Sequence, residues 1–575
     1  MIGIVLHKLP DSSIKTSKFS DQFFSHVTKI TKHENSYQNS NGICISNAYI
    51  PETLNASQKI WELYQKYNNK TVDFLRSEFS FGLVDESNTT FFGARDRMGI
   101  KPFYYYNSEE LFIYSTDIKF IIEKINNNYL SDEWILGSLS GTVFDKTTSP
   151  IRSIKKLPPA HYLILKDGQI TIKKYWDLKK QNIPLRSDKE NIELLKMKFK
   201  QAIKARLLGN IGGELSGGID SSGIIGHIAN EGQKVQAYSH MLTLKYHNKI
   251  SPYGDERFYR DLLADMYTNI NPQNIETPNK GLFSEIQNEI RLHAVPVNNA
   301  LTYLSDGIYE KAQEDGIDVL FSGFGGDEGI SNYGNVLFYE YAKNLKFSSL
   351  KKAIGKSYLS KDFIKYLVTP YWQSMDKSRK KWRQRSYNLF FINEEYAEAM
   401  NFDSLYWGHK KNQNIKTLDA HVYQKLSENY ISNRTELTGA SARTRGIEYT
   451  FPLLDIDLIE YYYNLPNSLK YKNGINRYLY REIIKNFVPE KIYRRKGKTG
   501  ATIPNSLLRF MNDYKKIEEF LQSARNGAAS SYINFDKMIE NMKLIKQMAE
   551  GKKGRSNPHI FLNALMLTIY LENEY

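Results

Sequence analysis

The stretch Ser216-Gly217-Gly218-Ile219-Asp220-Ser221-Ser222 decides how this sequence is interpreted. Its two glycines let the backbone approach a ligand closely, and serine hydroxyls beside the N–H groups of a helix start form a nest for anions. The residues from Gly223 to Ala229 continue as a helix. We therefore expect a phosphate-binding loop followed by a helix. It is not a Walker loop, because no Gly-Lys-Ser/Thr sequence follows.

Asp220 brings a carboxylate into this anion-binding stretch. A carboxylate repels phosphate directly, so its useful role beside a phosphate is to hold Mg²⁺, which prefers carboxylate, water and phosphate oxygens. The stretch therefore predicts a site for a nucleotide together with Mg²⁺.

Three further segments toward the C-terminus belong with this predicted nucleotide loop. Residues 320–328 read LFSGFGGDE, residues 446–455 read GIEYTFPLLD, and PEKI at 489–492 precedes KTGATIP at 498–504. Together with the first loop, these segments resemble the ATP-pyrophosphatase loop family and, within it, the asparagine synthetase superfamily. The resemblance implies a doubly wound parallel α/β sheet, of the adenine nucleotide α-hydrolase type, followed by a mainly helical C-terminal extension.

The resemblance also implies a reaction and its site residues. Family members use ATP to convert a carboxylate into an adenylate, which an amine then attacks, so that AMP and pyrophosphate are released. The growing charge on pyrophosphate must be neutralised by a metal and a positioned cation. Asp220 and Asp327 carry over as Mg²⁺ ligands and Lys498 as the cation, with Lys496 as the competing alignment. The implied ATP-binding residues are Ser216, Gly217, Gly218, Asp220, Ser221, Ser222, Ser322 and Gly323.

Glu448 is the second catalytic candidate, as the group that orients or deprotonates the amine; the alternative is a structural buried acid. Three positions depart from the family pattern. Phe324 stands where asparagine-forming members carry Glu or Asp and β-lactam-forming members carry Tyr, Thr450 replaces an arginine, and Ala501 replaces a phenylalanine. A phenyl ring can neither transfer a proton nor accept an ordinary hydrogen bond. Ordinary asparagine synthesis is therefore not expected.

The first 180 residues are β-rich and resemble the family's N-terminal glutaminase domain. Strand-like runs at 79–84 and 89–94 flank a turn, and a second hairpin is expected over 162–172. The resemblance rests mainly on ARDRMGIKPFYY at 94–105, and it implies an α+β fold, an Ntn-hydrolase-like αββα sandwich. From about 190 the apolar spacing becomes helical. We expect two domains, a glutaminase-like domain over 1–180 and an ATP-binding synthetase domain over 190–575.

Glutaminase domains of this kind use a cysteine at position 2 that becomes the first residue of the chain. Here position 2 is Ile2, which has no nucleophilic atom, and Cys44 is internal, without the free α-amine that would serve as a base. We expect a degenerate domain without glutamine hydrolysis.

The composition narrows the class of protein. The 575 residues are 41% hydrophobic and 25% charged, with no apolar run long enough to cross a membrane and no signal peptide, so a cytoplasmic enzyme is expected. A single cysteine excludes an internal disulfide and suits a reducing compartment. The net charge of +15 comes from lysines spread along the chain, so a nucleic-acid partner is not favoured. The densest basic run, at 377–385, is the one place for a polyanion or peptide partner, although a solvated helix face explains it as well.

Without an ammonia source, the amine must arrive on a substrate. We favour a macrolactam cyclase similar to those of lasso peptides, acting on a precursor peptide, with a leader-binding or leader-processing protein as a possible partner. The alternatives are asparagine formation from free ammonia, another natural-product amide transfer, and a β-lactam synthetase. Two hypotheses of other classes remain. A tRNA-modifying ligase would share the nucleotide loop but not the later segments, and a non-catalytic scaffold conflicts with an intact nucleotide loop.

Overall fold

The computed structural model describes the residues on which this account rests: 3–8, 14–16, 34–48, 55–184, 186–244, 255–297, 305–354, 364, 390–411, 417–495, 497, 506–552, 556 and 558–573. They form a mixed α/β protein, as the sequence predicts. None of the described helices is long and apolar enough to cross a membrane.

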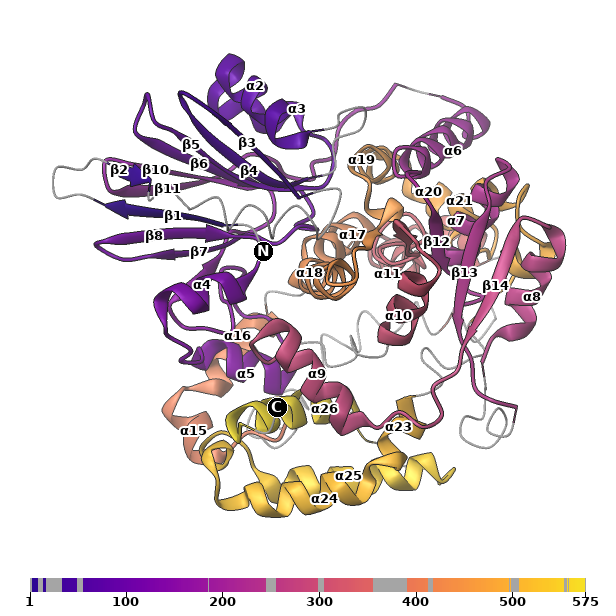
Figure 1. Ribbon diagram of the computed structural model, residues 1–575. Helices are drawn as coiled ribbons and strands as arrows, with labels where there is room; N and C mark the ends of the chain where they lie inside the picture. The colour runs from indigo at the N-terminus through magenta and orange to yellow at the C-terminus, as the bar shows by residue number, and fades with distance from the viewer. Residues whose placement is uncertain are drawn as a thin grey trace.

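A five-stranded parallel sheet forms the centre of the C-terminal part (Figure 1). Its strands lie in the order β14 (Ile270–Ile275), β13 (Val235–His240), β12 (Ile211–Glu214), β15 (Val319–Phe321) and β16 (Glu448–Thr450). The order reverses direction at the β12–β15 junction, and in open parallel sheets such a reversal leaves a crevice at the carboxyl ends of the strands. The two glycine-rich segments of the sequence, within residues 216–222 and 320–328, follow the strands β12 and β15. Both therefore lie at the carboxyl ends of the strands where a crevice is expected.

Helices surround this sheet and share one large apolar core with it. The helices that follow or precede its strands are α6 (Asp188–Lys204), α7 (Ile219–Asn230), α8 (Arg257–Met266), α9 (Leu282–His293) and α10 (Asp306–Glu314). Between β15 and β16 come α11 (Val336–Lys343), α12 (Phe347–Ile354), α15 (Glu394–Ala399), α16 (Phe402–Lys411), α17 (Leu418–Ser427) and α18 (Asn429–Arg443). After β16 follow the short turn η4 (Pro452–Leu454), α19 (Ile456–Asn464), α20 (Asn467–Lys470), α21 (Tyr478–Ile484) and α22 (Glu490–Tyr493).

The N-terminal part is built from two antiparallel sheets. The six-stranded sheet has the order β11 (Gln169–Lys174), β10 (His161–Lys166), β6 (Thr90–Arg95), β5 (Phe79–Asp85), β4 (Gly42–Ala48) and β3 (Glu34–Asn39). The five-stranded sheet has the order β2 (Ile14–Thr16), β1 (Gly3–Lys8), β8 (Leu111–Ser115), β7 (Tyr104–Asn107) and β9 (Ile154–Lys156). Apolar side chains from both sheets share one core, so the sheets pack face to face.

Helices cover the outer faces of the two sheets. The six-stranded sheet packs against α2 (Ala56–Tyr67) and α3 (Thr71–Phe74), and the five-stranded sheet packs against α4 (Ile118–Ile125). The helix after that, α5 (Asp132–Ser140), instead shares a core with the C-terminal helices α23 (Ser506–Asn512), α24 (Tyr514–Ser523), α25 (Phe535–Ala549) and α26 (Pro558–Leu571). The two sheets therefore have cores built almost entirely from the first 180 residues, and α5 is the N-terminal helix that packs into the core of the C-terminal helices (Figure 1).

The local predictions hold in the N-terminal part. Both expected hairpins form, as β5–β6 and β10–β11, because each pairs apolar alternating runs across a short polar turn. The helix after the first loop needs a correction, since it begins at Ile219 and not near Gly223. Gly218 adopts the extended conformation of an N-cap, and Ile219 turns into the core, so the first helical turn contains Asp220, Ser221 and Ser222.

Candidate functional site

The two glycine-rich segments meet at the carboxyl ends of β12 and β15, where Gly323 and Gly326 lie against Ser221 and Asp220. Gly217 has a φ of +78°, a conformation that favours glycine, and a Cβ atom there would meet the backbone oxygen of Glu256 at 2.8 Å. A Cβ atom at Gly323 would lie 2.7 Å from the backbone nitrogen of Ser221. Both positions therefore need glycine, and the second segment packs directly on the start of α7.

The start of α7 leaves backbone donors available to a ligand. Its N-cap residue, Gly218, has no side chain to accept hydrogen bonds from the first helical turn. The hydroxyl of Ser216 accepts a hydrogen bond from the Gly218 nitrogen at 3.2 Å and lies 3.1 Å from the hydroxyl of Ser221, which fixes the turn. Ser222 is fully buried, and its hydroxyl has no hydrogen-bond partner among the described residues. Uncapped N–H groups beside serine hydroxyls suit the phosphates of a nucleotide.

Asp220 and Asp327, the predicted metal ligands, face one and the same cation. Arg477 bonds the Oδ2 atom of Asp220 at 3.1 Å and also forms an ion pair with Asp327. Burial would lower the pKa of Arg477, and the charges of the two aspartates raise it above its ordinary value. The hydroxyl of Ser331 accepts a hydrogen bond from Arg477 at 3.0 Å and donates one to Asp220. The two carboxylates thus converge on one positive charge, and their oxygens are the ligands that Mg²⁺ prefers.

Arg477 is a residue that the sequence motifs did not single out. It is almost completely buried, its φ of +53° is uncommon for any residue other than glycine, and its guanidinium lies 3.9 Å from the ring centre of Tyr333. Backbone strain of this kind collects at functional sites. No local pattern distinguishes Arg477 among the 78 lysines and arginines of the chain, so only the fold reveals it.

The two lysine candidates, Lys498 and Lys496, and the substituted Ala501 lie outside the described residues. Their neighbour Arg495 is described, and it donates a hydrogen bond to the Gly217 carbonyl at 2.9 Å while forming an ion pair with Glu256. The segment that carries both lysines therefore reaches the nucleotide loop at Arg495.

Glu448 lies at the amino end of β16, where it pairs with Val319, the first residue of β15. The glycine-rich segments instead follow the carboxyl ends of β12 and β15. Its carboxylate is buried and forms an ion pair with Lys101 of the N-terminal part. At the other end of β16, the Thr450 carbonyl accepts a hydrogen bond from the Ser322 nitrogen at 3.0 Å. The structure places Glu448 in contact with the N-terminal part and does not bring it to the two aspartates.

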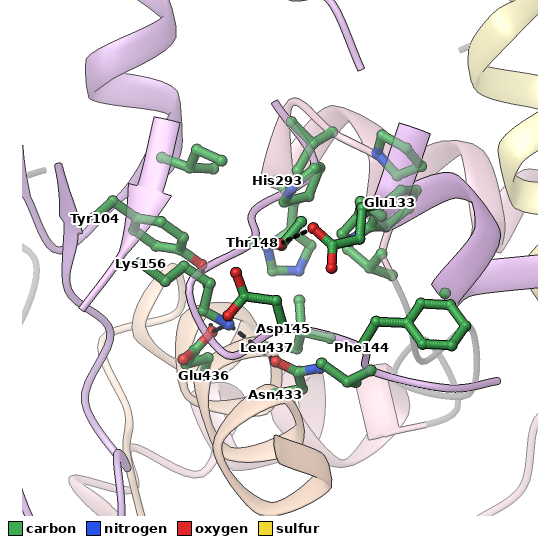
Figure 2. Close-up of a pocket in the computed structure, with 18 of the residues that line it drawn as sticks. Tyr104, Glu133, Phe144, Asp145, Thr148, Lys156, His293, Asn433, Glu436 and Leu437 are labelled. Atoms are coloured by element: carbon green, nitrogen blue, oxygen red, sulfur yellow. Dashed lines mark hydrogen bonds and ion pairs between the residues drawn. The ribbon is translucent and has the colours of Figure 1, made fainter. Parts of the chain in front are cut away.

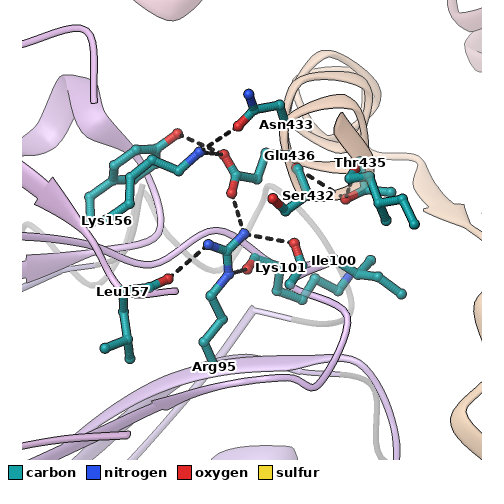
Figure 3. Close-up of polar contacts among 12 residues, drawn as sticks. Arg95, Ile100, Lys101, Lys156, Leu157, Ser432, Asn433, Thr435 and Glu436 are labelled. Carbon is teal, nitrogen blue, oxygen red and sulfur yellow. Dashed lines mark hydrogen bonds and ion pairs between the residues drawn. The ribbon is translucent and has the colours of Figure 1, made fainter. Parts of the chain in front are cut away.

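A second buried ion cluster joins the two parts of the molecule (Figure 3). The carboxylate of Glu436, on α18, pairs with Arg95 and, at 2.7 Å, with Lys156. Arg95 also donates hydrogen bonds to three backbone carbonyls, which are those of Gly99, Lys101 and Leu157. The positive charges of Lys156 and Arg95 lower the pKa of Glu436 although burial opposes this. Helix α18 is therefore held firmly against the N-terminal sheets.

A cavity of about 70 Å³ lies beside this cluster (Figure 2). Its polar lining includes Tyr104, Glu133, Asp145, Lys156, His293 and Glu436. None of the residues predicted to bind ATP or Mg²⁺ lines it. The cavity is thus separate from the glycine-rich segments.

Two family profiles match separate stretches of the chain. The sequence profile of the asparagine synthase family matches residues 194–570, and a glutamine amidotransferase domain profile matches residues 53–176. The amidase chry2 of Gibberella zeae is 24% identical over 80% of this chain and 74% of its own length. The glutamine-hydrolyzing asparagine synthetase 3 of Bacillus subtilis is 22% identical over 87% of this chain and 82% of its own. The amidase chyE of Penicillium rubens is 23% identical over 75% and 70%.

Proposed function

This chain belongs to the asparagine synthase family, an ATP-dependent amide-forming family, and on that premise we propose that it adenylates a carboxylate and passes the acyl group to an amine. The carboxylate oxygen attacks the α-phosphorus of ATP while the bond to pyrophosphate breaks. The amine nitrogen then attacks the acyl carbon, AMP departs, and the amine loses a proton.

The observation that carries this proposal is the convergence of Asp220 and Asp327 beside the uncapped start of α7. We assign the phosphates to the backbone and hydroxyls of Ser216, Gly217, Gly218, Ser221, Ser322 and Gly323, with Ser222 supporting the turn from the core. Mg²⁺ held by the two aspartates would neutralise charge on the departing pyrophosphate. Lys498 is the proposed cation on the same group. We assign Glu448 no role toward the amine, because it lies at the other end of β16 and its carboxylate pairs with Lys101.

We propose that the N-terminal part, residues 1–180, is a degenerate glutaminase domain of the Ntn-hydrolase type, packed on a synthetase domain over residues 190–575. The one cysteine of the sequence, Cys44, is fully buried in β4. Burial raises the pKa of its thiol well above the ordinary range, and a buried neutral thiol is a poor nucleophile. This supports the proposal that the attacking amine does not come from glutamine hydrolysed by this chain.

The finer proposal is a macrolactam cyclase of the lasso-peptide type, which joins the N-terminal amine of a precursor peptide to an acidic side chain inside the cytoplasm. Phe324 supports it, because an enzyme without a proton-transferring group there relies on a preformed substrate amine. A relative named asparagine synthetase supports a second candidate, asparagine formation, here from free ammonia. Another natural-product amide transfer and β-lactam closure remain as alternatives.

Mass spectrometry of the products separates these candidates. The protein is incubated with Mg²⁺, ATP and either a candidate precursor peptide or aspartate with ammonium chloride. A peptide that loses one water, resists carboxypeptidase and forms together with AMP supports the cyclase. Asparagine with AMP supports the second candidate and removes the cyclase.

A further inference from the structure

The cavity of about 70 Å³ has walls from both parts of the molecule (Figure 2). The N-terminal part contributes Tyr104 of β7, Trp134 of α5 and the residues 142–145 that follow α5. The C-terminal part contributes His293, at the end of α9, the residues 295–297 and one side of α18. A ligand held in this cavity would therefore contact both parts at once.

Two carboxylates of the lining form no ion pair within the described part of the chain. Glu133 accepts a hydrogen bond from the hydroxyl of Thr148 at 3.0 Å, and Asp145 accepts hydrogen bonds from the backbone nitrogen and the hydroxyl of Thr147 at 2.9 Å and 2.6 Å. These donors are neutral, so none of the bonds cancels a negative charge. Figure 2 shows the carboxylates of Glu133 and Asp145 turned toward the middle of the cavity.

The other charged groups of the lining have partners of their own. Lys156 pairs with Glu436 at 2.7 Å, and Glu436 also pairs with Arg95, so this cluster has one positive charge in excess. His293 lies 3.5 Å from the carboxylate of Glu289, which does not line the cavity. The two carboxylates described above bring two negative charges. Their excess favours a cation as the ligand.

The remaining walls are apolar and limit the size of the ligand. Trp134, Val295 and Val297 are buried, and small-molecule sites combine such walls with a few polar groups. Since a cavity of about 150 Å³ holds benzene, the volume here suits an ammonium group with a few carbon atoms. Asp145 lines the cavity and is exposed, so a longer chain can extend into solvent beside it.

We propose that this cavity binds a small primary alkylammonium ion. Its N–H groups donate to Glu133 and Asp145, and its carbon chain packs against Trp134, whose π face also attracts a cation. None of the residues assigned to ATP or Mg²⁺ lines the cavity, so the inference stands apart from the proposed nucleotide chemistry. Because both parts of the molecule form the walls, a bound ligand should stabilise the folded chain.

Isothermal titration calorimetry of the full chain with n-butylammonium chloride provides the test. Sodium chloride keeps the ionic strength equal, and 1-butanol is the neutral ligand of matched shape. We expect saturable binding of butylammonium with a Kd on the order of 1 mM, and a Tm that rises with its concentration. Butanol should bind about tenfold more weakly or not at all, since it leaves both carboxylates without a cation.

Two variants locate the binding site. Glu133→Gln should weaken butylammonium binding about tenfold or more, while its amide oxygen can still accept the hydrogen bond of Thr148. Asp145→Asn, at an exposed position, should also weaken binding. Glu110→Gln is the matched control, because it removes one negative charge from the exposed turn between β7 and β8, outside the cavity, and it should bind as the unaltered protein does.

Three results would overturn the inference. The first is the absence of saturable binding at about 100 mM butylammonium, a hundred times the expected constant. The second is equal binding of butanol and butylammonium. The third is a Kd that is unchanged in both Glu133→Gln and Asp145→Asn, or that rises equally in Glu110→Gln.

Discussion

Lys101 and Glu448 form a buried ion pair across 347 residues of sequence, and the pair joins the N-terminal sheets to the first residue of β16. The same short strand ends at Thr450, whose carbonyl holds the Ser322 nitrogen of the second glycine-rich segment. The N-terminal part thus supports the proposed nucleotide site through β16, even with its own cysteine buried.

Breaking this pair should destabilise the protein strongly. Lys101→Met or Glu448→Gln leaves a buried charge without its partner, which typically costs about 3–5 kcal/mol, whereas Lys101→Met/Glu448→Leu should recover much of the loss. Urea unfolding measures all three. The control pair, Arg76 with Asp457, is 41% and 51% exposed and should be worth no more than about 1 kcal/mol. Equal costs for both pairs would contradict the account.

Asp220→Ala and Asp327→Ala should each abolish pyrophosphate exchange while the fold persists. Each variant leaves the other aspartate paired with the buried Arg477, so the guanidinium keeps a counter-charge and the fold should persist with some loss of stability. Exchange assays and circular dichroism check this together. A near-normal rate in either variant would remove that aspartate from the metal site.

Lys498→Ala tests the positioned cation. An interaction that is stronger in the transition state than in the ground state raises kcat. We therefore expect Lys498→Ala to lower kcat by about 10²–10³ with little change in the KM for ATP. Lys498→Arg should recover only part of the rate, because its charge is spread over a planar group. Lys496→Ala is the control. A crippling loss there, with Lys498→Ala nearly silent, would move the assignment by two residues.

The buried Lys470 should make stability depend on pH. Burial and the charge of Lys180 lower its pKa from 10.5 to about 7, although Asp419 opposes the shift. Between about pH 7 and pH 10.5, Lys470 is protonated in the unfolded chain and not in the folded chain. The free energy of unfolding should therefore rise with pH across this window, by at most about 1.4 kcal/mol per unit. Lys470→Met should flatten the profile, and the exposed Lys200→Met should not. An unchanged slope in Lys470→Met would refute the assignment.

Glutamine should not serve as an amine donor. Because Cys44 is buried and neutral, incubation with glutamine should release no glutamate, and the Cys44→Ala variant should behave as the unaltered protein does. Glutamate release from glutamine by the purified protein would show that another group acts as the nucleophile.

Local patterns predict local structure well in this chain. The two hairpins follow from alternating apolar residues, and the glycine-rich segments follow from residue types that phosphate binding requires. The strands β15 and β16 have three residues each, too few for any periodicity to show. Their place beside β12 emerges only from the fold.

The candidate site was only partly accessible to sequence reasoning. Asp220 and Asp327 lie in recognisable motifs, but Arg477, which pairs with both, lies in a segment without a distinctive pattern. The partner of Glu448 could not be foreseen either. Contacts between residues hundreds of positions apart depend on tertiary packing, which a single sequence does not encode in any local signal.

The most direct test of the central claim follows the oxygen atoms of the carboxylate. Aspartate or a precursor peptide, whichever supports exchange, is labelled with heavy oxygen in its carboxyl groups and incubated with Mg²⁺, ATP and the amine. Adenylation predicts that one labelled oxygen appears in AMP and none in pyrophosphate. ADP together with labelled inorganic phosphate, or AMP without label, would contradict the account.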